Sequence, residues 1–207
     1  MKRLFVVVTG TDGSGKSTVI RHIRETFYRR GVPSFYHHLR PSLFPDLGVL
    51  LGRRGPSEPS CTHDNPHALP PSGTAGSLLR WGYYLLDYTV GHLMKVTLPG
   101  LSGGLYIFDR YYYDCLIDPL RFRVSLPERI LRLPLGFLPH PDVILCLGGD
   151  PGKIYARKPE TSLMEVERQV TALREFCRTR KNAFWIDTTV EMEATLKAVD
   201  AALLLKR

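Results

Sequence analysis

Long hydrophobic runs are missing from this 207-residue sequence. A membrane-spanning helix needs about 18 or more consecutive apolar residues, and Lys197 and Asp200 interrupt even the apolar C-terminal segment. Lys2 and Arg3 precede an apolar run that ends at residue 8, which is too short for a signal peptide. We therefore expect no membrane association and a cytoplasmic location.

Cysteine is scarce and unpatterned. The sequence has 4 cysteines, and none of them stands in a C-x-x-C pair: Cys61, Cys115, Cys146 and Cys177. This spacing excludes a disulfide framework and the usual zinc-binding patterns. We expect free thiols in a reducing compartment.

A concentrated basic stripe is also lacking, although the formal net charge is +8. The densest basic clusters are pairs such as Arg29-Arg30 and Arg53-Arg54, without interleaved aromatic residues. Nucleic-acid binding is therefore not expected. An excess of positive charge without such a stripe suits small polyanionic ligands, such as nucleotides.

Residues 10–17 carry the strongest functional signal, because their sequence GTDGSGKS fits the phosphate-binding pattern G-x-x-x-x-G-K-[ST]. The apolar residues 4–8 before it predict a buried strand, and residues 17–30 predict a helix. Lys16 is expected to reach the β- and γ-phosphates of ATP, and the Ser17 hydroxyl to bind Mg²⁺. The alternative is a glycine-rich turn followed by a solvent-facing lysine. The predicted ATP-phosphate site comprises Gly10, Thr11, Asp12, Gly13, Ser14, Gly15, Lys16, Ser17 and Thr18.

Strand and helix patterns alternate along the rest of the chain, which predicts an α/β fold. We expect a P-loop NTPase three-layer sandwich, with a five-stranded parallel sheet and helices on both faces. Residues 1–207 are expected to form a single P-loop kinase domain, with a mobile loop over residues 53–76. The further strands are predicted at 34–39, 105–108, 142–147 and 183–186, and the further helices at 77–98, 161–180 and 190–205.

Polar residues follow two of the predicted strands, where ligands bind in such sheets. Arg40 follows the second strand, and Asp109, Arg110 and Tyr111 follow the third. Asp109 can hold Mg²⁺ through water or orient an acceptor hydroxyl, and Arg110 can bind an acceptor phosphate with its planar fork. The alternative is an Asp–Arg ion pair at the strand end without a ligand.

A second basic segment lies within residues 150–162, where an Asp-Pro turn is followed by a short helix and then by Arg157 and Lys158. This layout is typical of a lid. Its cations can neutralise charge that develops on a transferred phosphoryl group. The alternative is a solvated basic turn.

These motifs together resemble the thymidylate kinase family of P-loop nucleoside monophosphate kinases, across about three quarters of the chain. The resemblance rests on residues 10–18, on residues 109–111 and on the lid with Arg157. It implies that Asp12 contacts the acceptor sugar hydroxyl, that Arg110 binds the acceptor phosphate and that Asp109 lies beside the point of transfer. It also implies that Arg157 supplies the catalytic arginine.

The acceptor half departs from that family. Family members carry an aromatic residue and then an arginine in the central helix, whereas this chain has aromatic residues but places Arg80 before them. The hydroxyl-rich segment expected after Tyr111 is replaced by residues 112–123, which contain Asp114, Asp118 and Arg121. The predicted substrate-binding residues are therefore Asp12, Arg40, Arg80, Asp109, Arg110 and Tyr111.

Three functions remain open at this stage. The first is an ATP- and Mg²⁺-dependent nucleoside monophosphate kinase that converts dTMP to dTDP, with Lys16, Asp109 and Arg157 as catalytic residues. The second is a kinase of the same fold that acts on a nucleoside, a sugar or another metabolite. The third is an ATP-binding regulatory protein without transfer chemistry. The expected partner is a small-molecule phosphate acceptor, and a homodimer is one option for the assembly.

Overall fold

The computed structural model describes residues 2–45, 73–122 and 124–204. Residues 53–72 of the predicted mobile loop, together with Cys61, lie outside the described residues. Cys115, Cys146 and Cys177 are buried free thiols. Among the described helices, none has the length and apolar character that a membrane crossing requires.

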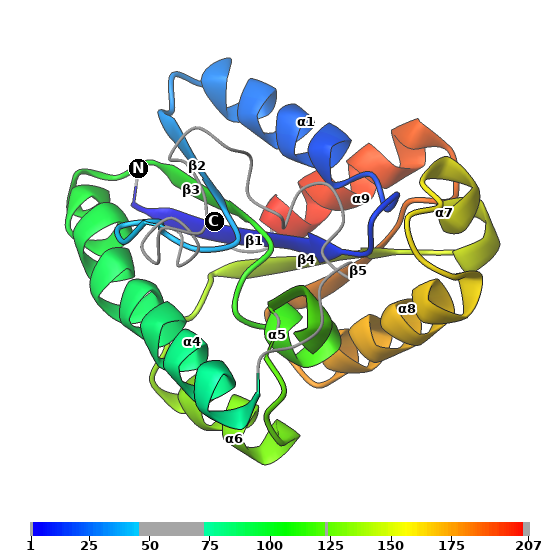
Figure 1. The fold of residues 1–207 in the computed structure, drawn as a ribbon. Helices are drawn as coiled ribbons and strands as arrows, with labels where there is room; N and C mark the ends of the chain where they lie inside the picture. The colour runs from blue at the N-terminus through cyan, green and yellow to red at the C-terminus, as the bar shows by residue number, and fades with distance from the viewer. Residues whose placement is uncertain (1, 46–72, 123, 205–207) are drawn as a thin grey trace. The chain divides into compact units, whose positions relative to one another are not determined.

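A five-stranded sheet forms the centre of the fold, and every neighbouring pair of strands is parallel (Figure 1). The strand order is β2-β3-β1-β4-β5, which confirms the predicted parallel sheet. The central strands β1, β3 and β4 are buried along their whole length, as apolar β-branched runs predict. The strands are β1 (Leu4–Gly10), β2 (Ser34–His38), β3 (Leu105–Asp109), β4 (Val143–Gly148) and β5 (Ala183–Asp187).

The sheet and its flanking helices belong to the first of two compact units, which comprises Met1–Leu39, Gly100–Tyr111 and His140–Arg207. Its helices are α1 (Lys16–Tyr28), α7 (Pro151–Arg157), α8 (Leu163–Arg178) and α9 (Met192–Leu204). The second unit comprises Arg40–Pro99 and Tyr112–Pro139. The expectation of a single domain over residues 1–207 stays a prediction.

Helices cover both faces of the sheet within the first unit (Figure 1). Because side chains alternate along a strand, Val6 and Val8 share one face, where they pack with Ile23 of α1 and Val199 of α9. On the opposite face, α8 packs against Trp185 of β5. This arrangement confirms the predicted layering.

The second unit is built around a long helical stretch. It begins with α4 (Thr74–Leu86) and continues as π-helical turns over Asp87–Gly91 and Leu93–Thr97. The predicted loop of residues 53–76 was therefore wrong at its end, because Gly73 caps a helix that starts at Thr74. The remaining elements of the unit are short: α5 (Asp114–Ile117), a 3₁₀ turn (Pro119–Phe122), α6 (Glu128–Arg132) and a 3₁₀ turn (Leu133–Gly136).

Candidate functional site

The glycine-rich loop joins β1 directly to α1, as the motif requires. Gly13 and Gly15 take positive φ angles of 81° and 80°, a conformation that favours glycine. Gly15 is the N-cap of α1 and, as a glycine, supplies no side-chain cap to the first amides of the helix. These amides and the positive end of the helix dipole therefore form a cradle for an anion.

Lys16 folds back over this loop. Its Nζ donates to the carbonyl oxygens of Gly10 at 3.1 Å and Thr11 at 2.8 Å, and it lies 3.7 Å from Asp12 Oδ1. The lysine charge is thereby held at the loop instead of facing solvent. This geometry argues against the alternative of a solvent-facing lysine.

Gly13 also explains how α7 approaches the loop. A Cβ at this position would lie 2.6 Å from the carbonyl oxygen of Ile154 and 3.3 Å from Lys158 Cβ. Only glycine permits this close approach, because the first contact is with rigid backbone. The loop and α7 are therefore neighbours.

The end of β3 contributes an unusual backbone conformation. Arg110 has a φ of 70°, which is uncommon for a residue other than glycine and is frequent at functional sites. Its backbone N–H donates to the carbonyl of Val8 at 2.8 Å, and its guanidinium lies 2.8 Å from Asp12 Oδ1. The structure thus joins two of the predicted acceptor contacts, Asp12 and Arg110, directly to each other. The observed ion pair of Arg110 is with Asp12 of the loop, whereas the alternative considered for the sequence was a pair between Asp109 and Arg110.

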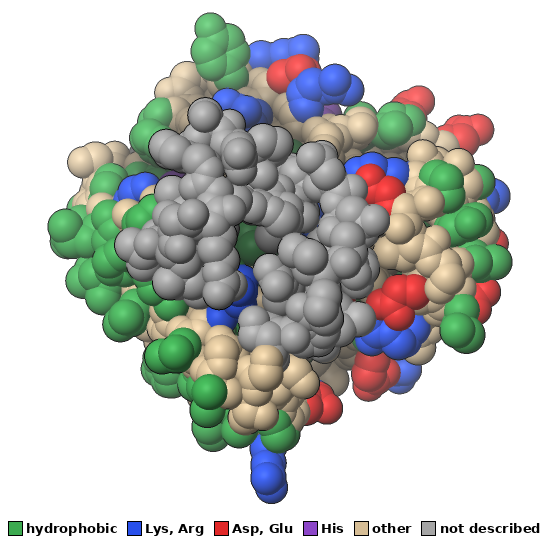
Figure 2. Space-filling view, in the orientation of Figure 1, with side chains coloured by type: hydrophobic (Ala, Val, Ile, Leu, Met, Phe, Trp, Pro, Cys, Tyr) green, Lys and Arg blue, Asp and Glu red, His purple; other side chains and the backbone are tan. Residues whose placement is uncertain are grey.

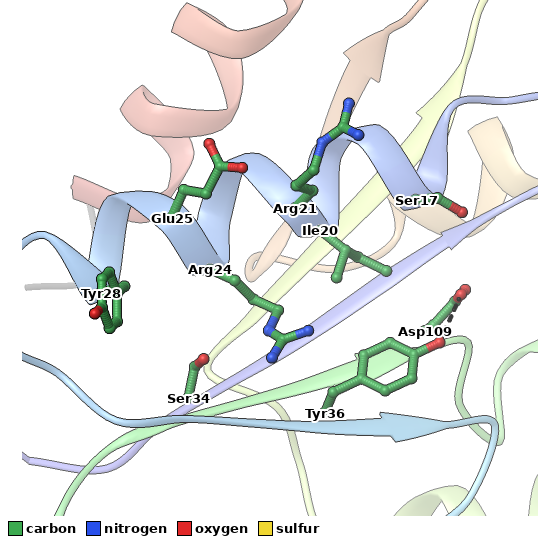
Figure 3. Close-up of a pocket in the computed structure, with 9 residues that line it drawn as sticks. All are labelled: Ser17, Ile20, Arg21, Arg24, Glu25, Tyr28, Ser34, Tyr36 and Asp109. Carbon is green, nitrogen blue, oxygen red and sulfur yellow. Dashed lines mark hydrogen bonds between the residues drawn. The ribbon is translucent and has the colours of Figure 1, made fainter.

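Asp109, the last residue of β3, is a nearly buried carboxylate that is 8% exposed. Its Oδ2 accepts a hydrogen bond from the Tyr36 hydroxyl at 3.2 Å (Figure 3). The same oxygen lies 3.7 Å from His38 Nδ1. Its Oδ1 is buried without a hydrogen-bond partner among the described residues. Burial raises the pKa of Asp109, but the neighbouring His38 side chain and the charges of Lys16 and Arg110 outweigh burial, so the pKa lies below its usual value.

Tyr36 and His38 were missed by the sequence analysis. Both residues are on β2, where period-two alternation places them on the same face. The β2–β3 register pairs His38 with Asp109, which brings both side chains to the carboxylate. The alternation was readable from the sequence, but the register against β3 was not.

Ser17 and Asp109 line one cavity, which makes them candidates for holding a cation together with nucleotide phosphates (Figure 3). The partnerless Oδ1 of Asp109 fits this role, because a buried, ionised oxygen is normally satisfied by a donor or a cation. Among the described residues, no group of three or more His, Cys, Asp or Glu side chains forms a metal site. One serine hydroxyl and one carboxylate fit Mg²⁺ whose remaining ligands are phosphate oxygens and water.

The lid cations are engaged with other groups. The Arg157 guanidinium donates to the carbonyl of Thr188 at 2.9 Å, and Lys158 Nζ lies 2.9 Å from Glu160. The segment has the predicted turn and short helix, with Asp150 accepting a hydrogen bond from the Lys153 backbone at 2.8 Å. Its role as a lid stays a prediction.

Arg40 lies in the second unit, in a buried ion pair. Its Nη1 is 2.8 Å from Asp87 Oδ2, and Asp87 is completely buried. Asp87 also accepts backbone hydrogen bonds from Ser42 and Leu43. Such a pair is costly to break, because a lone buried charge would remain. The predicted role of Arg40 in substrate binding stays a prediction.

Tyr111 and Arg80, two further predicted substrate contacts, lie in different units of the chain. The Tyr111 ring is fully buried in the first unit, where it packs edge-on against Phe5 and Phe108. Arg80 lies on α4 of the second unit, and its buried Nε has no hydrogen-bond partner among the described residues. The geometry gives Tyr111 a packing role and leaves Nε of Arg80 without a partner among the described residues.

The fold and the loop define an α/β protein of the P-loop type. No family model matches the chain. Over 151 residues it is 28% identical to a protein of Pyrococcus horikoshii named "Probable thymidylate kinase". The alignment covers 71% of this chain and 65% of that protein, so the chain spans less than two thirds of the length of its relative.

The Tyr36–Asp109 contact predicts a pH-dependent contribution to stability. Burial, followed by the charge of Asp109, raises the pKa of Tyr36 from 10.0 to about 12. The neutral phenol therefore stabilises the fold fully below pH 10.0, and this contribution is lost as the pH rises towards about 12. The measurement is urea unfolding at pH 9 and at pH 11. Between these two pH values, the free energy of unfolding should decrease less for Tyr36→Phe than for the wild type. Parallel losses in the two proteins would contradict the assignment.

Proposed function

We propose that this protein is an ATP-dependent phosphotransferase of the thymidylate kinase type, with a nucleoside monophosphate as acceptor and dTMP as the first candidate. The observation that carries the proposal is the convergence, in one unit, of the Lys16 loop, the ionised Asp109 and the Asp12–Arg110 pair. Phosphoryl transfer is mostly positioning and charge neutralisation, which these groups can supply. The distant similarity to a protein named as a thymidylate kinase supports the same class.

The donor side is assigned to the loop. The amides at the start of α1 would hold the ATP phosphates, and Lys16 would exchange its bonds to the Gly10 and Thr11 carbonyls for phosphate oxygens. Ser17 and Asp109 would hold Mg²⁺, which neutralises phosphate charge and orients the phosphates when it is bound. Asp109 is suited to this role because its low pKa keeps it ionised at neutral pH.

The acceptor side is assigned to Asp12 and Arg110. Their ion pair holds both side chains in place before an acceptor arrives. On binding, the Arg110 guanidinium would meet the acceptor phosphate, and the Asp12 carboxylate would accept a hydrogen bond from an acceptor hydroxyl. The left-handed backbone of Arg110 fixes the direction from which this side chain leaves the strand.

The lid cations are assigned to the transferred group. Arg157 and Lys158 follow the buried Ile154 on α7, and the Ile154 carbonyl lies against Gly13 of the loop. Both cations are bound to oxygen atoms, Arg157 to a carbonyl and Lys158 to a carboxylate. Each would therefore exchange one oxygen partner for another when it turns to the phosphoryl group.

An acceptor other than dTMP is the second candidate. The buried Arg40–Asp87 ion pair favours this second candidate. Arg40 was a predicted substrate contact, but its guanidinium is already paired with the carboxylate of Asp87. Release of ADP in a coupled assay, measured against a panel of nucleoside monophosphates, nucleosides and sugar phosphates, tests both candidates. If no acceptor increases ADP release above the rate without acceptor, the phosphotransferase proposal fails.

Lys16→Ala should abolish phosphoryl transfer while the protein remains folded. The loss should be several kcal/mol of transition-state stabilisation, about a thousandfold or more in rate, because the lysine acts on charged phosphates in a desolvated site. The assay is coupled ADP release with the best acceptor of the panel. Circular dichroism checks the fold, and near-normal turnover would contradict the role of the loop.

Arg110→Ala should raise the KM for the acceptor about tenfold or more while the KM for ATP changes little. The reason is that the guanidinium offers the acceptor phosphate a charged, planar partner, whereas the loop binds ATP without it. Asp12→Asn is the comparison variant for ATP binding, since it breaks the same ion pair and leaves the guanidinium in place. If both variants raised the KM for ATP equally, the Asp12–Arg110 pair would only stabilise the glycine-rich loop, and the role of Arg110 in acceptor binding would be contradicted.

The double change of Arg157 and Lys158 to Ala should lower kcat about a hundredfold and leave the affinity for ATP largely unchanged. An interaction formed mainly in the transition state affects kcat, whereas one formed equally in the ground state affects KM. Steady-state kinetics of both single variants and the double variant measure this. Arg168→Ala is the control, because Arg168 is a basic residue on α8 paired with Glu165. Normal turnover of the double variant would make this segment a solvated basic turn.

A further inference from the structure

A groove runs between α1 and the edge strand β2 in the first unit, with a cavity volume of about 530 Å³ (Figure 3). This volume falls within the range of small-molecule sites. One flank of α1 forms one wall, and Tyr36 of β2 forms the other. Ser17 and Asp109 also line it, so the groove adjoins the proposed cation position without including the rest of the glycine-rich loop.

Arg24 is the cation that this groove offers to a ligand. Its guanidinium extends from α1 towards Tyr36, whereas the guanidinium of Arg21 and the carboxylate of Glu25 point away from β2 (Figure 3). Within the described part of the chain, Arg24 forms no salt bridge, although its charge acts on the Tyr36 hydroxyl. Figure 2 shows basic side chains gathered along the edge of the molecule where α1 lies in Figure 1.

Tyr36 supplies a flat surface beneath that cation. Its side chain is 44% exposed, although its hydroxyl is hydrogen-bonded to Asp109. An aromatic ring with one open face stacks well on another planar ring. Ile20 adds apolar contact from the helix side. The groove thus offers an aromatic face, an apolar wall and a cation that has no carboxylate partner among the residues that the structure describes.

We propose that this groove is a second small-molecule site, separate from the glycine-rich loop, for a compound that carries an anionic group attached to a planar ring. Arg24 binds the anionic group, and the ring lies on Tyr36. The site does not depend on phosphoryl transfer, because it is defined by its own cation and its own aromatic surface.

The test uses phenyl phosphate as the probe and isothermal titration calorimetry as the measurement. All variants are made in the Lys16→Ala background, so that the glycine-rich loop competes less for the probe. Arg24→Gln should weaken binding about tenfold or more, as expected for the loss of a charged hydrogen bond to phosphate. Tyr36→Leu should weaken binding about threefold or more, and inorganic phosphate should bind more weakly than phenyl phosphate.

Arg21→Gln is the matched control, because Arg21 lies one turn earlier on the same flank of α1 and points away from β2. It should change the affinity less than about twofold, since its guanidinium is not directed at the ring. Equal losses for Arg21→Gln and Arg24→Gln would overturn the proposal in favour of a diffuse basic surface. Unchanged binding in Arg24→Gln, or no binding of phenyl phosphate at all, would overturn it as well. Circular dichroism of each variant excludes loss of fold as the cause.

Discussion

The parallel pairing of β1 with β3 is the constraint on which the candidate site depends. Its register places Val8 opposite Asp109, and the bond from the Arg110 N–H to the Val8 carbonyl extends the pairing by one residue. Asp109 and Arg110 therefore leave the sheet beside the loop that begins after Gly10. A slip of one residue would turn the Asp109 side chain to the opposite face and separate it from Tyr36, because successive side chains of a strand alternate. Backbone hydrogen bonds thus fix where the ionisable groups lie.

Three cations near the loop bind oxygen atoms of the protein. Lys16 binds two carbonyl groups, Arg110 binds Asp12 and Arg157 binds the Thr188 carbonyl. A buried cation without a partner would carry its full desolvation cost, so these contacts stabilise the largely buried charges of Lys16 and Arg110. When phosphate binds, each cation exchanges one oxygen partner for another. The free-energy cost of ordering these side chains is then smaller than it would be for side chains that were free before binding. The same logic singles out Asp109 Oδ1 as an oxygen that lacks a donor among the described residues.

The sequence was sufficient for the parts of this molecule that depend on local pattern. The phosphate-binding loop, the buried central strands and the order of the strands and longer helices were predicted, because continuous apolar runs and glycine positions are local signals, whereas the short helices α5 and α6 were not. The predicted strands at 105–108 and 183–186 each end one residue short of β3 and β5. The buried ion pair between Arg40 and Asp87 could not be predicted from the sequence, because the two residues are 47 positions apart and meet only through tertiary packing.

The same distinction explains the central helical stretch and the groove. Apolar residues such as Leu79 and Leu86 predicted the helix, yet they are 76% and 54% exposed, whereas the charged Asp87 is completely buried. A count of hydrophobic residues cannot predict that Asp87 is buried while these leucines are exposed, because the burial depends on backbone donors and on Arg40, which donate hydrogen bonds to the Asp87 carboxylate.

The role proposed for Arg24 was not predicted from the sequence for a related reason. A basic residue in the middle of an amphipathic helix is usually a solvated one, and only the position of β2 beside α1 gives its side chain an aromatic neighbour. One helix thereby serves two kinds of recognition: its N-terminal amides face the loop, and its flank faces the groove. Ser17 and Asp109 line that groove beside the loop, so an anion bound near Arg24 would lie in the electrostatic field of the same ionised carboxylate that the nucleotide would meet.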